Sequence, residues 1–242
     1  MNKLILCSIL LIGVLSSCSK KYKISGESSI SRLDGKMLFI KVIKDGTLVN
    51  IDSAEVIHGL FKMRGKVDSI QMATLFMDDV SIMPLVLERG DIKVSITNTT
   101  LEAKGTPLND RLYSFIETRN MLEASVDDLG SKEARMILDG KDPMEAHELV
   151  TKEGDSLVNV LNKQVKDFFA ENYENVLGPS VFIMLCSNLP YPVMTPQIED
   201  IIKDAPYSFK NDRSVKDFLN KAKENMELIK EQQRLNASVA GN

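Results

Sequence analysis

Residues 92–116 read IKVSITNTTLEAKGTPLNDRLYSFI, and the spacing of the apolar residues changes within this stretch. Before Gly105 apolar and polar residues alternate, which is the period of a β-strand with one buried face. After Gly105 the apolar residues recur every three or four positions, as on the buried side of a helix. Thr106 and Pro107 form a helix start, with a capping hydroxyl followed by a proline at the first helical position. The stretch therefore marks the border between a β region and a helical region.

Upstream of this border the same alternation recurs between turn signals such as Asp45-Gly46 and His58-Gly59. The predicted strands are Met37–Lys44, Thr47–Val56, Leu60–Arg64, Ser69–Met77, Ser81–Leu87 and Ile92–Thr97. Many short strands at close spacing are typical of a sandwich or a barrel. We therefore predict an α+β fold, in which an antiparallel β-sandwich or barrel spans residues 22–105.

Downstream of the border, a helical region is expected over residues 106–235. Seven of the eight prolines lie at or after Pro107, within this region. Its predicted helices begin at Pro107, run from about Pro143 to Asn172 and from Pro179 to Asn188, start again after Thr195, and run from Asn211 to Arg234. On the long second helix, Leu157, Val158, Leu161, Val165, Phe168 and Phe169 are expected to face inward. Residues 236–242 are small and polar, so we expect a frayed tail.

Composition limits the classes of function. The chain has 242 residues, of which 43% are hydrophobic and 26% charged, so it has the composition of a folded globular protein. Its net charge is −4. Without a basic excess, no nucleic-acid partner is expected.

The N-terminus has the pattern of a bacterial lipoprotein signal. Lys3 precedes an apolar run, Leu4–Leu15, that is too short to span a bilayer. The run ends in Leu15-Ser16-Ser17-Cys18, an aliphatic residue and two small residues before a cysteine. We therefore predict that residues 1–17 are a cleaved signal peptide, that Cys18 is lipidated, and that residues 18–23 are a tether. Several acyl chains on one cysteine give stable membrane anchoring.

Residues that could perform chemistry are few. The sequence has no Cys-x-x-Cys, no Gly-x-Ser-x-Gly, no phosphate-binding loop and no His-Glu-x-x-His. Cys186 lies in an apolar stretch, which favours a buried packing thiol over a nucleophile. His58 precedes a turn glycine, and His147 lies near acidic residues at a helix start, so both are interpreted as solvated side chains. Arg89-Gly90-Asp91 is interpreted as a hairpin turn. We expect neither a cofactor nor a metal site.

Three segments taken together resemble a known family. Residues 51–69 (IDSAEVIHGLFKMRGKVDS) have the pattern of its recurring hairpin. Residues 85–96 (LVLERGDIKVSI) resemble its last hairpin, and residues 104–112 (KGTPLNDRL) its exit into a helix. In this order they resemble the Bacteroidetes domain of unknown function 4369. The resemblance implies a lipobox before this domain and helices after it, and residues 211–235 resemble those helices.

The same resemblance implies that a thioredoxin-like domain of the thiol:disulfide interchange type follows the helices. This sequence has no Cys-x-x-Cys in that place, so disulfide exchange is not expected of these residues.

Three functions remain open on these observations. The first is a non-catalytic binding or scaffolding lipoprotein with an unknown envelope protein or ligand as its partner, and we favour it because an anchor and a core lie beside few catalytic residues. The second is a redox accessory that acts in trans with a separate thioredoxin-like lipoprotein. The third is a hydrolase or carbohydrate-active enzyme built from scattered carboxylates.

Two further expectations concern the cell envelope. Lys20, Lys21 and Lys23 follow Cys18, whereas an acidic cluster there would resemble a surface-export signal, so we expect the chain on the periplasmic face of the outer membrane. Ser53, Ser69 and Ser156 each lie in an Asp-Ser-aliphatic triplet that resembles the Bacteroidetes periplasmic O-glycosylation site.

Overall fold

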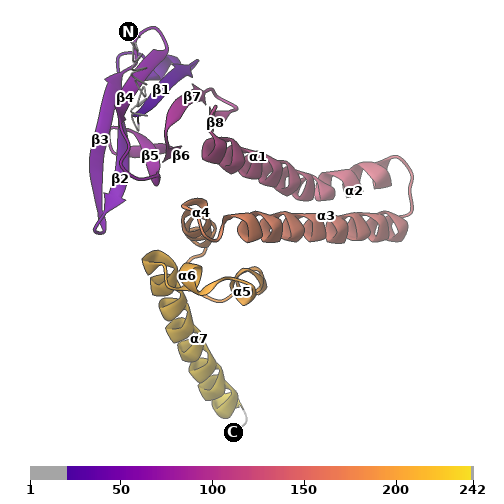
Figure 1. The fold of residues 1–242 in the computed structure, drawn as a ribbon. Helices are drawn as coiled ribbons and strands as arrows, with labels where there is room; N and C mark the ends of the chain where they lie inside the picture. The colour runs from indigo at the N-terminus through magenta and orange to yellow at the C-terminus, as the bar shows by residue number, and fades with distance from the viewer. Residues whose placement is uncertain (1–20, 241–242) are drawn as a thin grey trace, which may run out of the picture.

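The computed structural model describes residues 21–240, and within them eight strands precede seven helices (Figure 1). The predictions for the signal peptide, residues 1–17, and for Cys18 lie outside the described residues. The strands are β1 (Lys21–Ser28), β2 (Met37–Lys44), β3 (Thr47–Glu55), β4 (Leu60–Lys66), β5 (Gln71–Met77), β6 (Val80–Leu87), β7 (Gly90–Ile96) and β8 (Leu101–Lys104). A short 3-10 turn, Ser31–Leu33, lies between β1 and β2.

The strands form two four-stranded sheets with the orders β4-β1-β7-β8 and β3-β2-β5-β6. The inward residues of both sheets, among them Ile24, Leu38, Leu75 and Ile92, share one hydrophobic core. The predicted α+β class, with a β-sandwich before a helical region, is confirmed. One pairing is parallel: β1 lies beside β7 with Ile24 opposite Ile92. Because β2 to β6 intervene, the chain has the long crossover that a parallel pair requires.

The six predicted strands are observed with ends that shift by at most two residues. Alternation of apolar and polar residues did not predict β1 and β8. Both contain charged residues on their outer side, for example Lys21, Lys23 and Glu102, which dilute the apolar signal.

The prediction of a hairpin at Arg89-Gly90-Asp91, and hence over residues 85–96, is wrong. β6 pairs with β5 in one sheet, whereas β7 pairs with β1 and β8 in the other, so the chain crosses between the sheets here. The turn at His58-Gly59 is confirmed, because the backbones of Ile57 and Leu60 bond to each other across it. However, β3 and β4 diverge into different sheets beyond that turn. Alternation predicts each strand but not its partner.

The helices are α1 (Pro107–Asp127), α2 (Leu129–Leu138), α3 (Pro143–Asn172), α4 (Leu177–Cys186), α5 (Pro196–Lys203), α6 (Tyr207–Lys210) and α7 (Arg213–Ala240). Figure 1 shows α1 and α2 running out from the sandwich and α3 returning beside them. Aromatic rings hold the inner part together: Phe115 of α1 lies 4.1 Å from Phe168 of α3, measured between ring centroids. Phe182 of α4 packs edge-on against Phe169 of α3 and Phe218 of α7.

Three details of the helical region differ from the predictions. α2 and α6 are additional helices. Val158 is 43% exposed, because the outer half of α3 packs against α1 and α2 on one side only. α7 continues to Ala240, so most of the predicted frayed tail is helical, and its sequence has no glycine or proline before Gly241.

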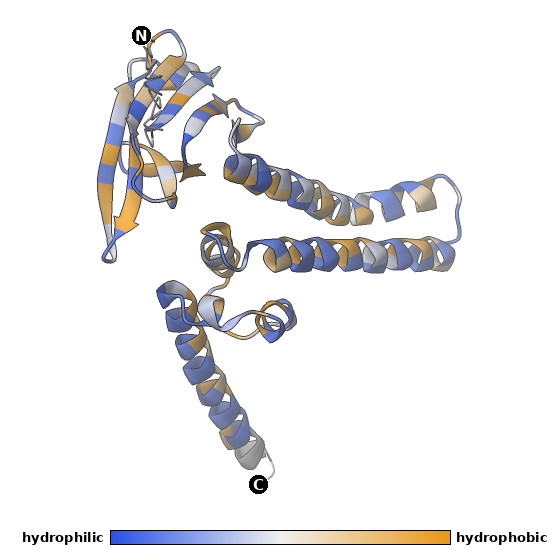
Figure 2. Cartoon of the chain, in the orientation of Figure 1, coloured by the Kyte–Doolittle hydropathy of each residue, from blue (hydrophilic) through white to orange (hydrophobic). Residues whose placement is uncertain are grey.

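Figure 2 shows α7 as largely hydrophilic, with hydrophobic residues confined to a stripe. Among residues 21–240, none of the helices combines the length and the apolar character needed to cross a bilayer.

Candidate functional site

The helical region is attached to the sandwich by a buried carboxylate. Glu88, just after β6, accepts hydrogen bonds from the backbone N–H groups of Leu108 and Asn109 at 2.8 and 3.1 Å. These N–H groups have no partner within helix α1. The negative charge of Glu88 also interacts favourably with the positive end of the helix dipole. The prediction that the Thr106 hydroxyl caps this helix is wrong. That hydroxyl is buried and accepts from the Asn109 side chain instead, at 2.9 Å.

A second set of bonds ties α1 to the free edge of β6. The Asn109 side-chain amide accepts from the Val86 N–H at 2.9 Å and donates to the Val86 carbonyl at 2.8 Å. One turn further, the Tyr113 hydroxyl donates to the Pro84 carbonyl at 2.6 Å. Burial raises the pKa of this phenol, so it remains a donor. The side chains of α1 thus pair with an edge strand as a neighbouring strand would, which fixes the helices relative to the sandwich.

This attachment places α4 opposite the outer face of the sheet that contains β2 and β5. A groove of about 600 Å³ lies between them. Its apolar walls come from the sandwich on one side and from α4 on the other. The main apolar residues are Val42, Ile43, Leu48, Met72, Val176, Pro179, Ile183 and Met184. Lys41, Asp212 and Ser214 are among its polar residues. We call this space the junction groove.

The end of the β2–β3 hairpin leaves apolar side chains in solvent beside the junction groove. Ile43 is 72% exposed and Leu48 is 56% exposed. Figure 2 shows hydrophobic residues extending down both strands to the end of this hairpin. A groove with apolar walls beside exposed apolar side chains is typical of a surface that binds another molecule.

Lys41 forms one polar side of the junction groove. Its ammonium lies 4.6 Å from the ring centroid of Phe76 and 3.5 Å from the Asp79 carboxylate. It also donates to the Asp78 carbonyl at 3.2 Å. These contacts keep the charge of Lys41 on the sheet side of the groove.

A smaller hollow lies on the other side of α4, between this helix, α1 and the edge of β6. Arg119 of α1 lines it and forms an ion pair with Glu123, whose Oε1 lies 2.6 Å from Nη2. The second terminal nitrogen of Arg119, Nη1, is buried and has no hydrogen-bond partner among the described residues. The hollow therefore has a mixed lining, with apolar residues beside polar ones such as Asn120 and Asn188.

Residues 22–112 match the family model of a domain of unknown function (DUF4369). This confirms the resemblance inferred from residues 51–69, 85–96 and 104–112. The matched range starts in β1 and ends inside α1, so it includes both the sandwich and the Glu88–Asn109 attachment. No curated protein and no solved structure matches the chain.

The serines with a predicted modification all lie at the surface. Ser53 is exposed on β3, an edge strand of its sheet. Ser69 is exposed between β4 and β5, and Ser156 is exposed on α3. Their glycosylation stays a prediction, as does lipidation of Cys18, which lies outside the described residues.

Cys186 is a buried thiol at the end of α4, as predicted. Burial raises its pKa to about 12, so the thiol is protonated at neutral pH and is a poor nucleophile.

Both histidines are exposed, as predicted. His147 Nδ1 lies 3.0 Å from the Glu133 carboxylate, and Asp142 caps α3 by accepting from the N–H groups of Met144 and Glu145. Within residues 21–240, no three His, Cys, Asp or Glu side chains are grouped as metal ligands would be.

Sequence patterns did not predict that the residues of the attachment or of the junction groove form a site. Glu88 carried no distinguishing signal, because a charged residue between the apolar run Leu85–Leu87 and Gly90 looks like an ordinary turn residue. Ile43 and Leu48 also carried none. Their alternation is that of any strand, and only the packing of α4 shows that they border a groove.

Proposed function

We propose that this chain is a membrane-anchored lipoprotein, facing the periplasm, whose folded part is a non-catalytic binding module. The observation that carries the binding part is the junction groove with Ile43 and Leu48 exposed beside it. The anchoring part rests on the Leu15–Cys18 pattern and on the short distance in sequence between Cys18 and β1.

The groove suits an apolar segment of a partner protein. The Asn109 and Glu88 bonds fix α1 to the sandwich, and ring packing of Phe182 joins α4 to α3 and α7. Both walls therefore belong to packed elements, which lowers the ordering cost of binding. The polar residues around it, among them Lys41 and Asp212, can pair with the backbone of a bound segment.

In-cell photo-crosslinking tests this proposal. A crosslinker placed at residue 43 or 48 should capture a defined envelope partner, whereas one at Leu138, which is 85% exposed at the end of α2, should not. With the captured protein purified, Ile43→Asp and Leu48→Asp should each weaken binding at least about tenfold, because a charge replaces a buried apolar contact. Leu138→Asp should leave binding unchanged.

Equal binding by all three variants would show that the groove is not the binding site. The identity of the partner also decides between the two functions that involve one. A thioredoxin-like lipoprotein would favour the redox accessory. Because its thiol is buried, Cys186 would then serve the partner only through packing of α4.

A further inference from the structure

One end of the sandwich concentrates positive charge. A shallow depression there is lined by the start of β1, the end of β4 and the start of β7. Its charged residues are Lys21, Lys23, Arg64, Lys66, Arg89 and Asp91. Five cations and one carboxylate give this end a net charge of +4, whereas the whole chain carries −4. We call it the basic end.

The register of β1 and β4 places like charges directly opposite each other. Lys21 pairs with Lys66, and Lys23 pairs with Arg64. The Cβ atoms of directly opposed residues lie about 5 Å apart, and like charges on such a pair destabilise a sheet. Only one described ion pair relieves the set, between Lys23 and Asp91 at 3.1 Å. An anionic partner would remove this repulsion.

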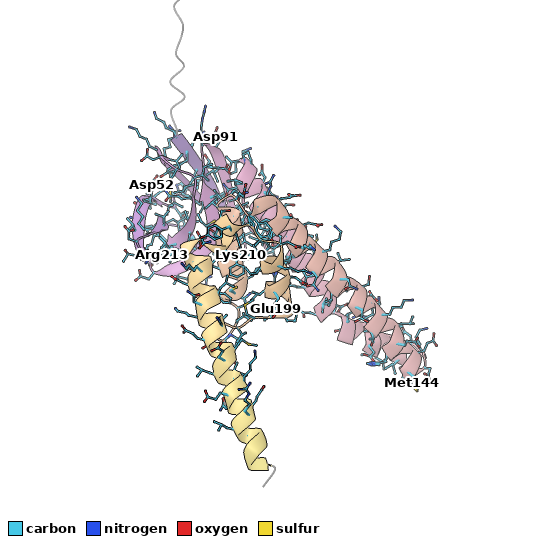
Figure 3. The ribbon with its side chains drawn as sticks, turned by 60° about the horizontal axis from the view of Figure 1, so that its bottom comes forward. Asp52, Asp91, Met144, Glu199, Lys210 and Arg213 are labelled. Carbon is cyan, nitrogen blue, oxygen red and sulfur yellow. The ribbon has the colours of Figure 1, made fainter. Side chains whose placement is uncertain are left out.

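The position of the basic end indicates which anionic partner. Lys21 is three residues after Cys18, and three residues span at most about 11 Å. The start of β1 therefore lies within that distance of the residue that we propose to be lipidated. Figure 3 shows Asp91 at the end of the molecule opposite the C-terminal end of α7, and Met144 also lies far from Asp91. The helices therefore extend away from the basic end.

We propose that the basic end lies directly on an anionic phospholipid surface, with Arg64, Lys66 and Arg89 among the headgroup phosphates. The proposal rests on the lipid anchor at Cys18 that the proposed function includes. Cations at an anionic surface add to the binding provided by acyl chains. Five of them on one rigid face would also fix the orientation of the domain, so that the helical arms point away from the bilayer.

Vesicle sedimentation tests this contact without the anchor. The chain from Ser19 onward, produced without lipid, is mixed with vesicles of phosphatidylcholine or of phosphatidylcholine with phosphatidylglycerol, at about 1 mM lipid. We expect binding to the anionic vesicles only, and weaker binding as salt is raised. The double variant Arg64→Glu/Lys66→Glu should bind at least about 25-fold more weakly, since each lost cation contributes about fivefold and each new carboxylate repels the anionic surface.

The matched control is Lys216→Glu/Lys221→Glu, which makes the same charge change at exposed positions of α7. It should bind like the unchanged chain. The proposal is overturned by equal binding to both vesicle types, by equal losses in the two double variants, or by a single-stranded oligonucleotide that competes fully with the anionic vesicles. That last result would assign the basic end to nucleic acid.

The outcome is separable from the fate of the anchor. Absence of acyl chains on Cys18 in cells would refute the lipoprotein part of the proposed function and leave the vesicle result unaffected. Conversely, a lipidated chain whose unlipidated form ignores anionic vesicles would refute only the contact through the basic end.

Discussion

At the scale of single residues, two aromatic side chains depend on a glycine in the neighbouring strand. Tyr22 lies over Gly65, and Phe61 lies over Gly26, each pair directly opposed between β1 and β4. A Cβ on Gly26 would lie 2.0 Å from the Phe61 ring, and one on Gly65 would lie 2.4 Å from the Tyr22 oxygen. Tyr22 also donates to Asp52 of β3 at 2.9 Å, which joins the two sheets.

We expect Gly26→Ala to destabilise the sandwich by about 1–3 kcal/mol, because the added methyl group overpacks the site. Chemical denaturation measures this loss. In a Phe61→Leu background the same change should cost less. Gly130→Ala, on α2 where an added Cβ meets no atom, should be neutral or slightly stabilising. A Gly26→Ala chain as stable as the original would disprove the close packing.

Cys186 gives a second prediction at this scale. Its thiol should react slowly with an alkylating reagent until denaturant is added, because the folded state favours the protonated form. Cys186→Ala should cost about 1 kcal/mol through a small cavity. The pKa of the thiol is 9.0 in the unfolded chain and about 12 in the folded chain. Ionisation of the unfolded thiol therefore lowers the free energy of unfolding progressively as the pH rises above 9. The variant should therefore lose less stability over that alkaline range. Fast labelling of the native chain would instead indicate a reactive thiol.

At the scale of elements, the attachment of α1 to β6 decides where the helical region lies. The Val86 N–H and carbonyl, which belong to the edge strand of a sheet, are both satisfied by Asn109. Glu88 in turn satisfies the start of the helix. The attachment therefore depends on buried polar groups whose partners come from two different regions of the chain.

Asn109→Ala should destabilise the protein by about 2–4 kcal/mol, because it leaves two buried backbone groups unpaired. Tyr113→Phe, which removes a single hydrogen bond to Pro84, should cost about 1 kcal/mol. Glu88→Gln keeps an acceptor oxygen and should cost less than Glu88→Ala. Urea unfolding of the four variants gives the order, and an Asn109→Ala cost no greater than that of Tyr113→Phe would contradict it.

The paired cations of β1 and β4 give a prediction at the same scale. Lys66→Glu should raise the melting temperature by roughly 1–3 °C at low salt, because the Lys21–Lys66 repulsion becomes an attraction. The gain should shrink in high salt, where exposed charges are screened. Calorimetry at two salt concentrations checks this, with Lys216→Glu on α7 as the control. A lower melting temperature would show that the two side chains do not interact as the register implies.

At the scale of the whole molecule, the two proposed surfaces lie in different places. The basic end is next to the tether, whereas the junction groove lies between the sandwich and α4. An anchored chain that rests on its basic end would present its helical arms, including the C-terminal end of α7, away from the bilayer (Figure 3).

Anchoring itself is tested at Cys18. Cys18→Ala should abolish incorporation of labelled acyl chains and cleavage by the lipoprotein peptidase, because the cysteine supplies both the lipidated thiol and the new N-terminus. Metabolic labelling with fractionation checks this, and protease treatment of intact cells should spare the unchanged protein. Labelled lipid on the Cys18→Ala chain would refute the lipobox assignment. Removal of the protein from intact cells would refute the periplasmic location.

Local chemistry alone determined much of this molecule. Alternation over Met37–Lys44 and the proline starts at Pro107, Pro143 and Pro196 predicted elements that the structure contains, since hydrophobic period and capping depend on neighbours in sequence. The buried state of Cys186 was also readable from its apolar surroundings.

Only the tertiary structure decided which elements meet. The parallel pairing of β1 with β7, the crossing between sheets at Gly90 and the helix cap from Glu88 all join residues distant in sequence. Lys21 and Lys66 become neighbours for the same reason. Strand register and helix docking depend on the burial of whole faces and on the pairing of buried polar groups across the fold, and no period within one segment encodes them. Both proposed surfaces are formed at this level.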